Sequence, residues 1–184
     1  LNLSSTNFAR KNFTWTTNFN IAHNSNKILE LYYGVPTSFG SYAWMEGYDS
    51  QTWNLVRWAG VDPSDGSPMW YDKNGNITRT FSTANRVPYK SKTPLLSGGL
   101  VNNLSWKNWT LSFQINYLIG GYALPTYASI YFKDGYDIIG ANQAVEVYKY
   151  RWTTPGVPSK FPKVSQLSSK SAMNSTRFIY NRTN

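Results

Sequence analysis

The sequence predicts an all-β fold of antiparallel strands, and it favours part of a membrane-spanning barrel over a soluble sandwich. Apolar and polar residues alternate in long runs near residues 12–24, 96–106 and 109–119. This period of two is typical of a strand with one apolar and one polar face. Each run lasts roughly 9–11 residues, the length that a tilted strand needs to cross a bilayer. Soluble strands average nearer about 5–6 residues, although a soluble sandwich predicts the same alternation.

The first run follows what resembles a short turn at residues 9–11. Its apolar side chains take the odd positions, and most of the even positions hold Thr or Asn. We therefore expect Phe13, Trp15 and Phe19 to face lipid and the even positions to face a water-filled lumen. Phe13 and Trp15 begin the run, where aromatic rings suit the boundary between membrane and water.

Only Lys107 and Asn108 separate the other two runs. Two polar residues between two alternating segments predict a tight β-hairpin. Trp109 lies at this turn, at the expected membrane interface, and Gln114 should face water. The lipid-facing residues expected in the second strand of the hairpin are Leu111, Phe113 and Ile115. A further strand is expected near residues 51–60, and roughly six strand-like segments occur in all.

The connections between the expected strands are unequal in length. Segments 34–49, 61–93 and 122–165 are long and rich in Gly, Pro and Asp, whereas the Lys107–Asn108 turn is minimal. Outer-membrane barrels have short turns on the periplasmic side and long loops outside. Because a strand must cross completely before the chain turns, we expect the three long segments to share the outer side and Lys107–Asn108 to lie on the other.

The composition argues against several functional classes. The 184 residues include no Cys, which excludes a disulfide framework or thiolate site, and His23 is the only His. The formal charge of +9 is scattered rather than gathered into basic runs, so nucleic acid is not an expected partner. No phosphate-binding loop, dinucleotide motif or nucleophile elbow occurs. We expect a protein that is not an enzyme and has no cofactor.

Several segments, taken in order, form a more specific pattern. They are NFTWTTNFNI (12–21), NKILEL (26–31), RWAGVDP (57–63), DGSPMW (65–70), residues 72–78, residues 94–121 with the WKNW hairpin (106–109), RWTTPG (151–156) and STRF (175–178). Their order and spacing resemble the SusC/RagA family of TonB-dependent outer-membrane transporters, over nearly the whole chain.

The resemblance implies a fold and a function. Residues 1–184 would form part of a single transmembrane barrel of about 22 strands, with the plug domain and the final strands outside this sequence. The family imports glycans or peptides across the cell outer membrane, together with a SusD-like surface lipoprotein that acts as a lid. Energy arrives through TonB, which would contact the missing N-terminal region.

The long segments also contain candidate binding residues. Exposed aromatic rings can stack on sugars or peptide side chains, and the candidates for substrate contact are Tyr42, Trp44, Tyr48, Trp70 and Tyr71; Tyr136 is another loop aromatic. Within the loop 62–76, residues 72–76 have Asp and Asn at alternate positions and are interpreted first as a polar turn. If the loop folded back, Asp62 and Asp65 could join Asp72 as oxygen ligands of calcium.

Two other interpretations of the sequence stay open. One is a soluble all-β carbohydrate-binding module whose aromatic residues form a platform for sugars. The other is an adhesin-like structural fragment, which would need no partner lipoprotein. Folding without detergent as a monodisperse monomer would contradict the barrel.

Overall fold

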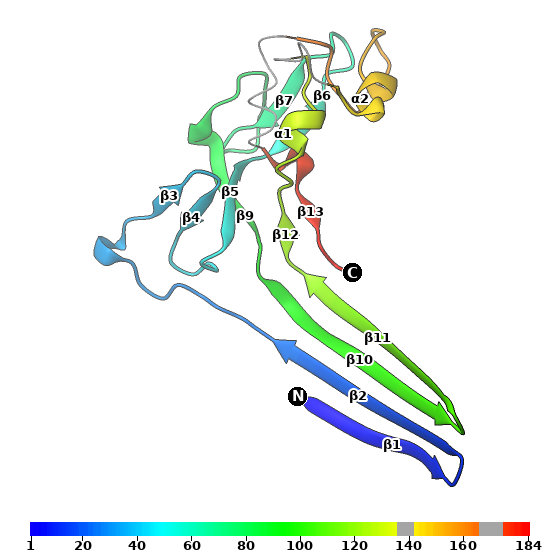
Figure 1. The fold of residues 1–184 in the computed structure, drawn as a ribbon. Coiled ribbons are helices and arrows are strands. Elements are labelled where there is room, and N and C mark those ends of the chain that lie inside the picture. Colours follow the sequence, from blue (N-terminus) through cyan, green and yellow to red (C-terminus); the bar gives the residue numbers. More distant parts are fainter. Residues whose placement is uncertain (136–141, 166–174) are drawn as a thin grey trace.

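The computed structural model describes residues 1–135, 142–165 and 175–184. Figure 1 shows two parts. Four long strands form one extended sheet, here called the long sheet. The remaining elements gather at one end of it and form what we call the head.

The long sheet has the strand order β1 (Asn2–Arg10), β2 (Phe13–His23), β10 (Pro94–Trp106) and β11 (Trp109–Gly120), with every neighbouring pair antiparallel. The strands predicted near residues 12–24, 96–106 and 109–119 are confirmed. β1 was not predicted, and its turn to β2 lies at Lys11 and Asn12 rather than at residues 9–11.

A β-bulge explains why the alternation of β1 is invisible in the sequence. Thr6 lies opposite Thr16 but Phe8 lies opposite Trp15, so Asn7 is an extra residue. The bulge changes the phase of the strand. Leu3, opposite Phe19, and Phe8 therefore share one face although they are five residues apart.

Both hairpin turns of the long sheet lie at the end opposite the head (Figure 1). The predicted turn at Lys107–Asn108 is confirmed, and Lys107 has a φ of 51°. A positive φ at this position is a feature of the tight hairpin turns that match strand twist. The Lys107 amide also donates to the Asn12 carbonyl over 2.9 Å, which links the two turns.

The head contains several small sheets. β3 (Thr37–Phe39), β4 (Tyr42–Trp44), β5 (Thr52–Val56) and β9 (Arg86–Ser91) form one; β6 (Trp58–Val61), β7 (Pro68–Tyr71) and β8 (Ile77–Thr78) form another; β12 (Tyr122–Ala123) pairs with β13 (Tyr180–Asn181). The helices are α1 (Ala128–Tyr131) and α2 (Val145–Tyr150), with 3-10 turns η1 (Tyr32–Gly34), η2 (Thr83–Asn85) and η3 (Thr176–Phe178). No helix in the described ranges is long and apolar enough to span a membrane.

The prediction of a single strand near residues 51–60 is wrong. The chain forms β5 and β6 there, in two different sheets, with Arg57 between them. The Arg57 carbonyl accepts from the Tyr71 amide, and the Trp58 amide donates to the Thr176 hydroxyl. The backbone therefore changes partners at Arg57. The described residues contain 13 strands rather than about six.

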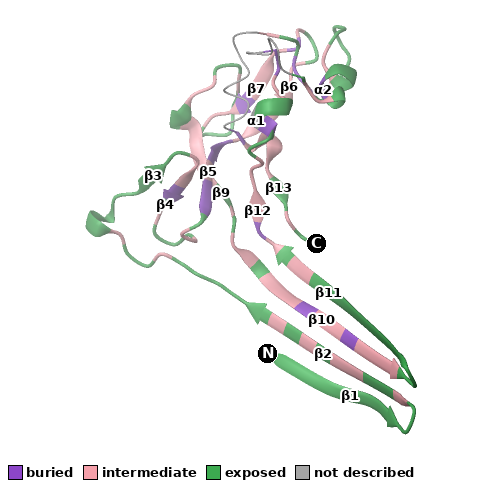
Figure 2. Ribbon diagram, viewed as in Figure 1, coloured by how far each residue is buried: buried purple, intermediate pink, exposed green. Residues whose placement is uncertain are grey.

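The hydrophobic core lies entirely in the head. Its buried apolar residues are Ala43, Trp53, Leu55, Val56, Trp70, Ala128, Val147 and Phe161. The apolar side chains of the long sheet are exposed or half-buried instead, and most of those along β11 are exposed (Figure 2). Trp109 is 76% exposed and Leu111 60%.

Candidate functional site

The register of the long sheet places the six predicted lipid-facing residues on one face. Rows of facing residues run across β2, β10 and β11. The rows are Phe13–Trp106–Trp109, Trp15–Leu104–Leu111, Thr17–Asn102–Phe113 and Phe19–Leu100–Ile115. The opposite face is mainly Thr, Ser, Asn and Gln and includes Gln114. The sheet therefore has an apolar face and a polar face along its whole height.

A polar cluster interrupts the apolar face at mid-height, and the sequence reasoning missed it. Asn102 is only 6% exposed, and its side-chain oxygen accepts from the Trp15 indole N–H over 2.9 Å and from the Thr17 hydroxyl over 2.7 Å. Asn7 in the bulge donates to the Thr17 hydroxyl over 2.5 Å. A polar group on an apolar face is costly unless it is hydrogen-bonded. The available signal was the break in alternation at Asn102.

The five loop aromatics proposed for substrate contact do not meet at one place. Tyr42 stacks on Trp53 with ring centroids 4.2 Å apart, and Trp44 packs edge-on against Phe39. Trp70 is only 2% exposed and lies in the second sheet of the head.

The remaining two candidates also lie apart. Tyr48 is 44% exposed in the loop after β4, and Tyr71 ends β7, where it lies beneath the Arg57 guanidinium. Tyr136 is outside the described residues.

The aspartates considered for calcium each stabilise their own turn. The Asp62 carboxylate accepts from the Ser64 hydroxyl over 2.6 Å and pairs with Arg79. These bonds, the Ser64 bonds first, lower the pKa of Asp62 to about 2. Asp65 and Asp72 accept from Ser67 and Asn76 in the same way. Within the described ranges no three His, Cys, Asp or Glu residues are grouped to hold a metal. The expectation of no cofactor, with calcium as the less favoured alternative, is not tested.

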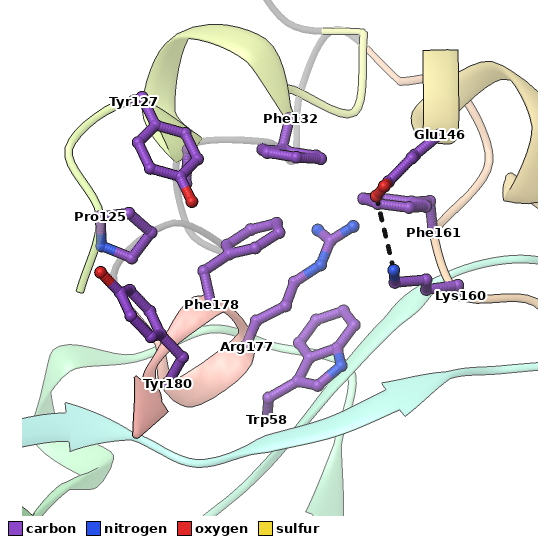
Figure 3. Close-up of a pocket in the computed structure, with 11 residues that line it drawn as sticks. Trp58, Pro125, Tyr127, Phe132, Glu146, Lys160, Phe161, Arg177, Phe178 and Tyr180 are labelled. Atoms are coloured by element: carbon purple, nitrogen blue, oxygen red, sulfur yellow. Dashed lines mark ion pairs between the residues drawn. The ribbon is translucent and has the colours of Figure 1, made fainter. Parts of the chain in front are cut away.

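The head contains a pocket of about 320 Å³ with aromatic walls (Figure 3). Trp58 comes from β6, Phe132 follows α1, Phe161 lies in the 151–163 segment and Phe178 ends η3. None of the five proposed loop aromatics lines it. The sequence reasoning missed this pocket because its walls come from separate segments.

A buried ion pair holds the aromatic walls together. Arg177 makes two hydrogen bonds to the Asp134 carboxylate, and the two side chains are 4% and 1% exposed. The guanidinium carbon lies 4.7 Å from the ring centroid of Phe178, 4.8 Å from that of Trp58 and 5.1 Å from that of Phe161. Cations are attracted to ring faces at such distances. Burial raises the pKa of Asp134, and Arg177 opposes this effect.

Several of the sequence motifs singled out above contact one another in the head, and RWAGVDP and STRF do so at the wall of this pocket. In the STRF segment the Ser175 hydroxyl accepts from the Arg177 amide, and the Thr176 hydroxyl accepts from Trp58 of RWAGVDP over 3.0 Å. The Trp152 indole of RWTTPG donates to the Pro63 carbonyl over 2.9 Å. These motifs therefore join distant segments into the head.

Gly66 shows why one motif needs a glycine. Its φ is 73°, and an added Cβ would lie 2.5 Å from the Trp152 ring. L-residues with side chains rarely adopt this φ, and no carbon fits at this distance. The DGSPMW segment can therefore approach RWTTPG only through a glycine.

Comparison with known proteins identifies the fold. No protein-family model matches the chain, and no curated protein matches it. Among solved structures, the chain is similar to a chain of the RagAB peptide transporter, with a TM-score of 0.83 and 22% identity over 99% of this chain and 21% of that one. This chain has the fold of one part of that transporter chain.

Two further structures agree. Chains of the RagAB peptide importer in its closed-closed and open-open states give TM-scores of 0.82 and 0.84, each at 22% identity. These matches again cover 99% of this chain, and they cover 21% and 20% of the two solved chains. The resemblance to the SusC/RagA family is thus confirmed as a shared fold, and the chain spans about a fifth of the length of those chains.

Proposed function

We propose that this chain is a segment of a TonB-dependent outer-membrane transporter that imports glycans or peptides with a SusD-like surface lipoprotein. The observation that carries the proposal is the shared fold with the RagAB transporter chains over 99% of this chain. Those neighbours are transporters rather than enzymes. The long sheet would be barrel wall, and the head would lie on the outer side.

The burial pattern supports a wall in contact with lipid. The apolar face of β11 is exposed although the head has a core of its own. In water this arrangement is unfavourable, because about 25 cal/mol is lost for each Å² of apolar surface left uncovered. Hydrocarbon removes that cost. The strands of 9–13 residues match the thickness to be crossed.

The sheet edges support a closed barrel. An unpaired strand edge is not tolerated in lipid, so β1 and β11 would each need a further partner. Residues at the C-terminal end already begin such a pairing. Asn184 and Leu118 exchange backbone hydrogen bonds of 2.9 and 3.2 Å, which is the pattern of an antiparallel pair.

In the proposed transporter the two ends of the wall have different tasks. The described parts of segments 34–49, 61–93 and 122–165 lie at the head end, and Lys107–Asn108 lies at the other (Figure 1). The head would meet the lid lipoprotein and the substrate. TonB would act from the opposite side through the N-terminal plug region of the full-length protein.

Cysteine labelling tests the topology. This segment has no Cys, so single cysteines can be placed in a cysteine-free full-length protein. A membrane-impermeant maleimide on intact cells should label Asn74→Cys in the head and spare Lys107→Cys at the turns. Lysis should expose both. Labelling of Lys107→Cys alone would invert the topology.

A second pair of cysteines tests the faces. In purified outer membranes Gln114→Cys should react through the lumen, and Phe113→Cys should not. Equal labelling in a protein that stays soluble and monodisperse without detergent would support the carbohydrate-binding module instead. Co-purification of a surface lipoprotein with the full-length protein tests the partner, and its absence would favour the adhesin-like fragment.

A further inference from the structure

We propose that the aromatic pocket of the head binds a single apolar or aromatic side chain of a peptide. The inference rests on the proposed function and selects peptides from the two substrate classes left open there. At about 320 Å³ the pocket lies at the small end of the range for ligand sites, which is roughly 300–1,000 Å³. It suits one side chain rather than an oligosaccharide.

The chemistry of the walls favours an apolar occupant over a sugar. Trp58, Phe132, Phe161 and Phe178 line the space, and the Arg177 guanidinium lies among these rings (Figure 3). A buried sugar ring carries several hydroxyl groups, and each unpaired one costs free energy. The buried cation in the wall, Arg177, is already paired with Asp134. An apolar side chain leaves no such groups unsatisfied.

Polar groups occur at the rim instead. Lys160 and Glu146 form an ion pair of 3.5 Å, and their side chains are 65% and 55% exposed. In Figure 3 this pair lies at the edge of the aromatic cluster, beside Phe161. One rim group donates hydrogen bonds and the other accepts them. This pair complements the N–H and C=O groups of a peptide main chain that passes over the pocket.

The walls are fixed before any ligand arrives. Phe132 stacks on Phe161 with centroids 6.0 Å apart and an interplanar angle of 2°, and it also contacts Phe178. The buried Arg177–Asp134 pair fixes the guanidinium against the same rings, 5.1 Å from the ring centroid of Phe161. The side chains of a preformed pocket do not have to become ordered when a ligand binds. Less conformational entropy is therefore lost, which favours affinity.

The chain offers a matched pair of tyrosines for a test. Tyr127 lies directly before α1, lines the pocket and is 51% exposed, whereas Tyr131 ends α1, is 48% exposed and does not line the pocket. Neither side chain is in the core, so Tyr127→Ala and Tyr131→Ala should both fold. The two variants therefore separate loss of the pocket wall from general loss of an exposed aromatic residue.

The experiment uses ligand-observed NMR to measure the affinity of three probes for the full-length protein in detergent. The probes are N-acetyl-phenylalanine amide, N-acetyl-alanine amide and methyl β-D-glucopyranoside. We expect the phenylalanine probe to bind more tightly than the other two, and Tyr127→Ala to weaken it by about fivefold, as expected for the loss of one ring contact. Tyr131→Ala should leave its affinity unchanged.

Three results would overturn the inference. They are preferential binding of the glucoside with loss in Tyr127→Ala, equal effects of the two tyrosine variants, and no preference for phenylalanine over alanine. The labelling of Asn74→Cys, Lys107→Cys, Phe113→Cys and Gln114→Cys is independent of all three. A protein with the expected labelling but the wrong probe preference would refute only the peptide pocket.

Discussion

The long sheet and the head bury apolar residues in opposite ways. The long sheet has strands of 9–13 residues and contributes none of the buried apolar side chains of the described chain. The head has strands of 2–6 residues and contributes all of them. The head therefore carries its own core, whereas the long sheet needs a surrounding that is itself apolar.

The same difference appears in how each region is held together. In the long sheet, regular ladders of backbone bonds join neighbouring strands, and the polar cluster at Asn102 is its main side-chain network. In the head, single contacts join segments far apart in the chain, such as Trp58 to Thr176. A substitution in the core of the head should therefore weaken the neighbouring contacts of that core. The effect of a substitution in the long sheet on stability should depend on which face carries the changed residue.

The largest effect is expected when the buried ion pair of the head is broken. Asp134→Ala leaves Arg177 buried without a countercharge, which should destabilise the head by about 3–5 kcal/mol. A fluorophore on Asn74→Cys would report melting of the head, and one on Lys107→Cys would report the turns of the long sheet. Only the first should melt earlier.

A control variant keeps this prediction specific. Asp65 also has a charged neighbour, Arg79, but its side chain is 41% exposed, so Asp65→Ala should lose only its exposed pair and the Ser67 bonds of its turn, with a much smaller effect than Asp134→Ala. If both reporters melted together after Asp134→Ala, the two regions would form one cooperative unit and the comparison would fail.

The next largest effect tests the two faces of the long sheet. Phe113→Arg should cost about 2–4 kcal/mol near the bilayer midplane, because the charge would meet hydrocarbon. Gln114→Arg should be mild, because the neighbouring position faces water. Denaturant unfolding of the refolded protein in lipid vesicles measures both. Equal costs would mean that the faces are wrongly assigned.

The long sheet was predictable because its signal is local. A period of two along β2, β10 and β11 specifies both strand and face without knowledge of any distant residue. The prediction failed where that period is broken. The bulge at Asn7 hid β1, and Asn102 interrupts the apolar stripe with an amide that is satisfied only by Trp15 and Thr17 of another strand.

The head could not be predicted in the same way. Its strands are too short to show a period, and its pairings depend on contacts such as Arg177 with Asp134 and Trp152 with Pro63. The motifs containing Trp58, Trp152 and Arg177 were visible in the sequence, but nothing local indicates that they meet. The aromatic pocket is a consequence of those meetings.

A smaller effect is expected from the polar cluster on the apolar face. Trp15→Phe keeps a ring of similar character but removes the N–H that bonds Asn102, which should cost about 0.5–1.5 kcal/mol. Adding Asn102→Leu should recover stability, because an apolar pair at this face leaves no amide to satisfy. Unfolding in lipid vesicles measures the cycle. A double variant less stable to unfolding than Trp15→Phe alone would show that the cluster has another role.

The smallest effect concerns the surface of the head. The pKa of Asp62 is lowered to about 2, first by the hydrogen bonds of Ser64 and then by Arg79. A carboxyl group whose pKa is lower in the folded state stabilises that state above its unfolded pKa of about 3.9. This stabilisation is lost as the pH falls from about 4 towards 2. Ser64→Ala removes the largest single cause, the hydroxyl hydrogen bond, although the Ser64 backbone N–H bond stays, and we expect it to raise the pKa of Asp62 more than Arg79→Ala does.

Carbon-13 NMR of the labelled Asp carboxyl groups across an acid titration would rank the two variants. The pair with Arg79 is exposed on the arginine side, where the guanidinium-bearing side chain is 56% accessible, and salt screens such contacts. Added salt should therefore shift the pKa of Asp62 in the Ser64→Ala variant, where Arg79 remains, more than in Arg79→Ala. A larger rise in the pKa of Asp62 in Arg79→Ala than in Ser64→Ala would mean that Arg79, rather than the local turn, keeps Asp62 ionised.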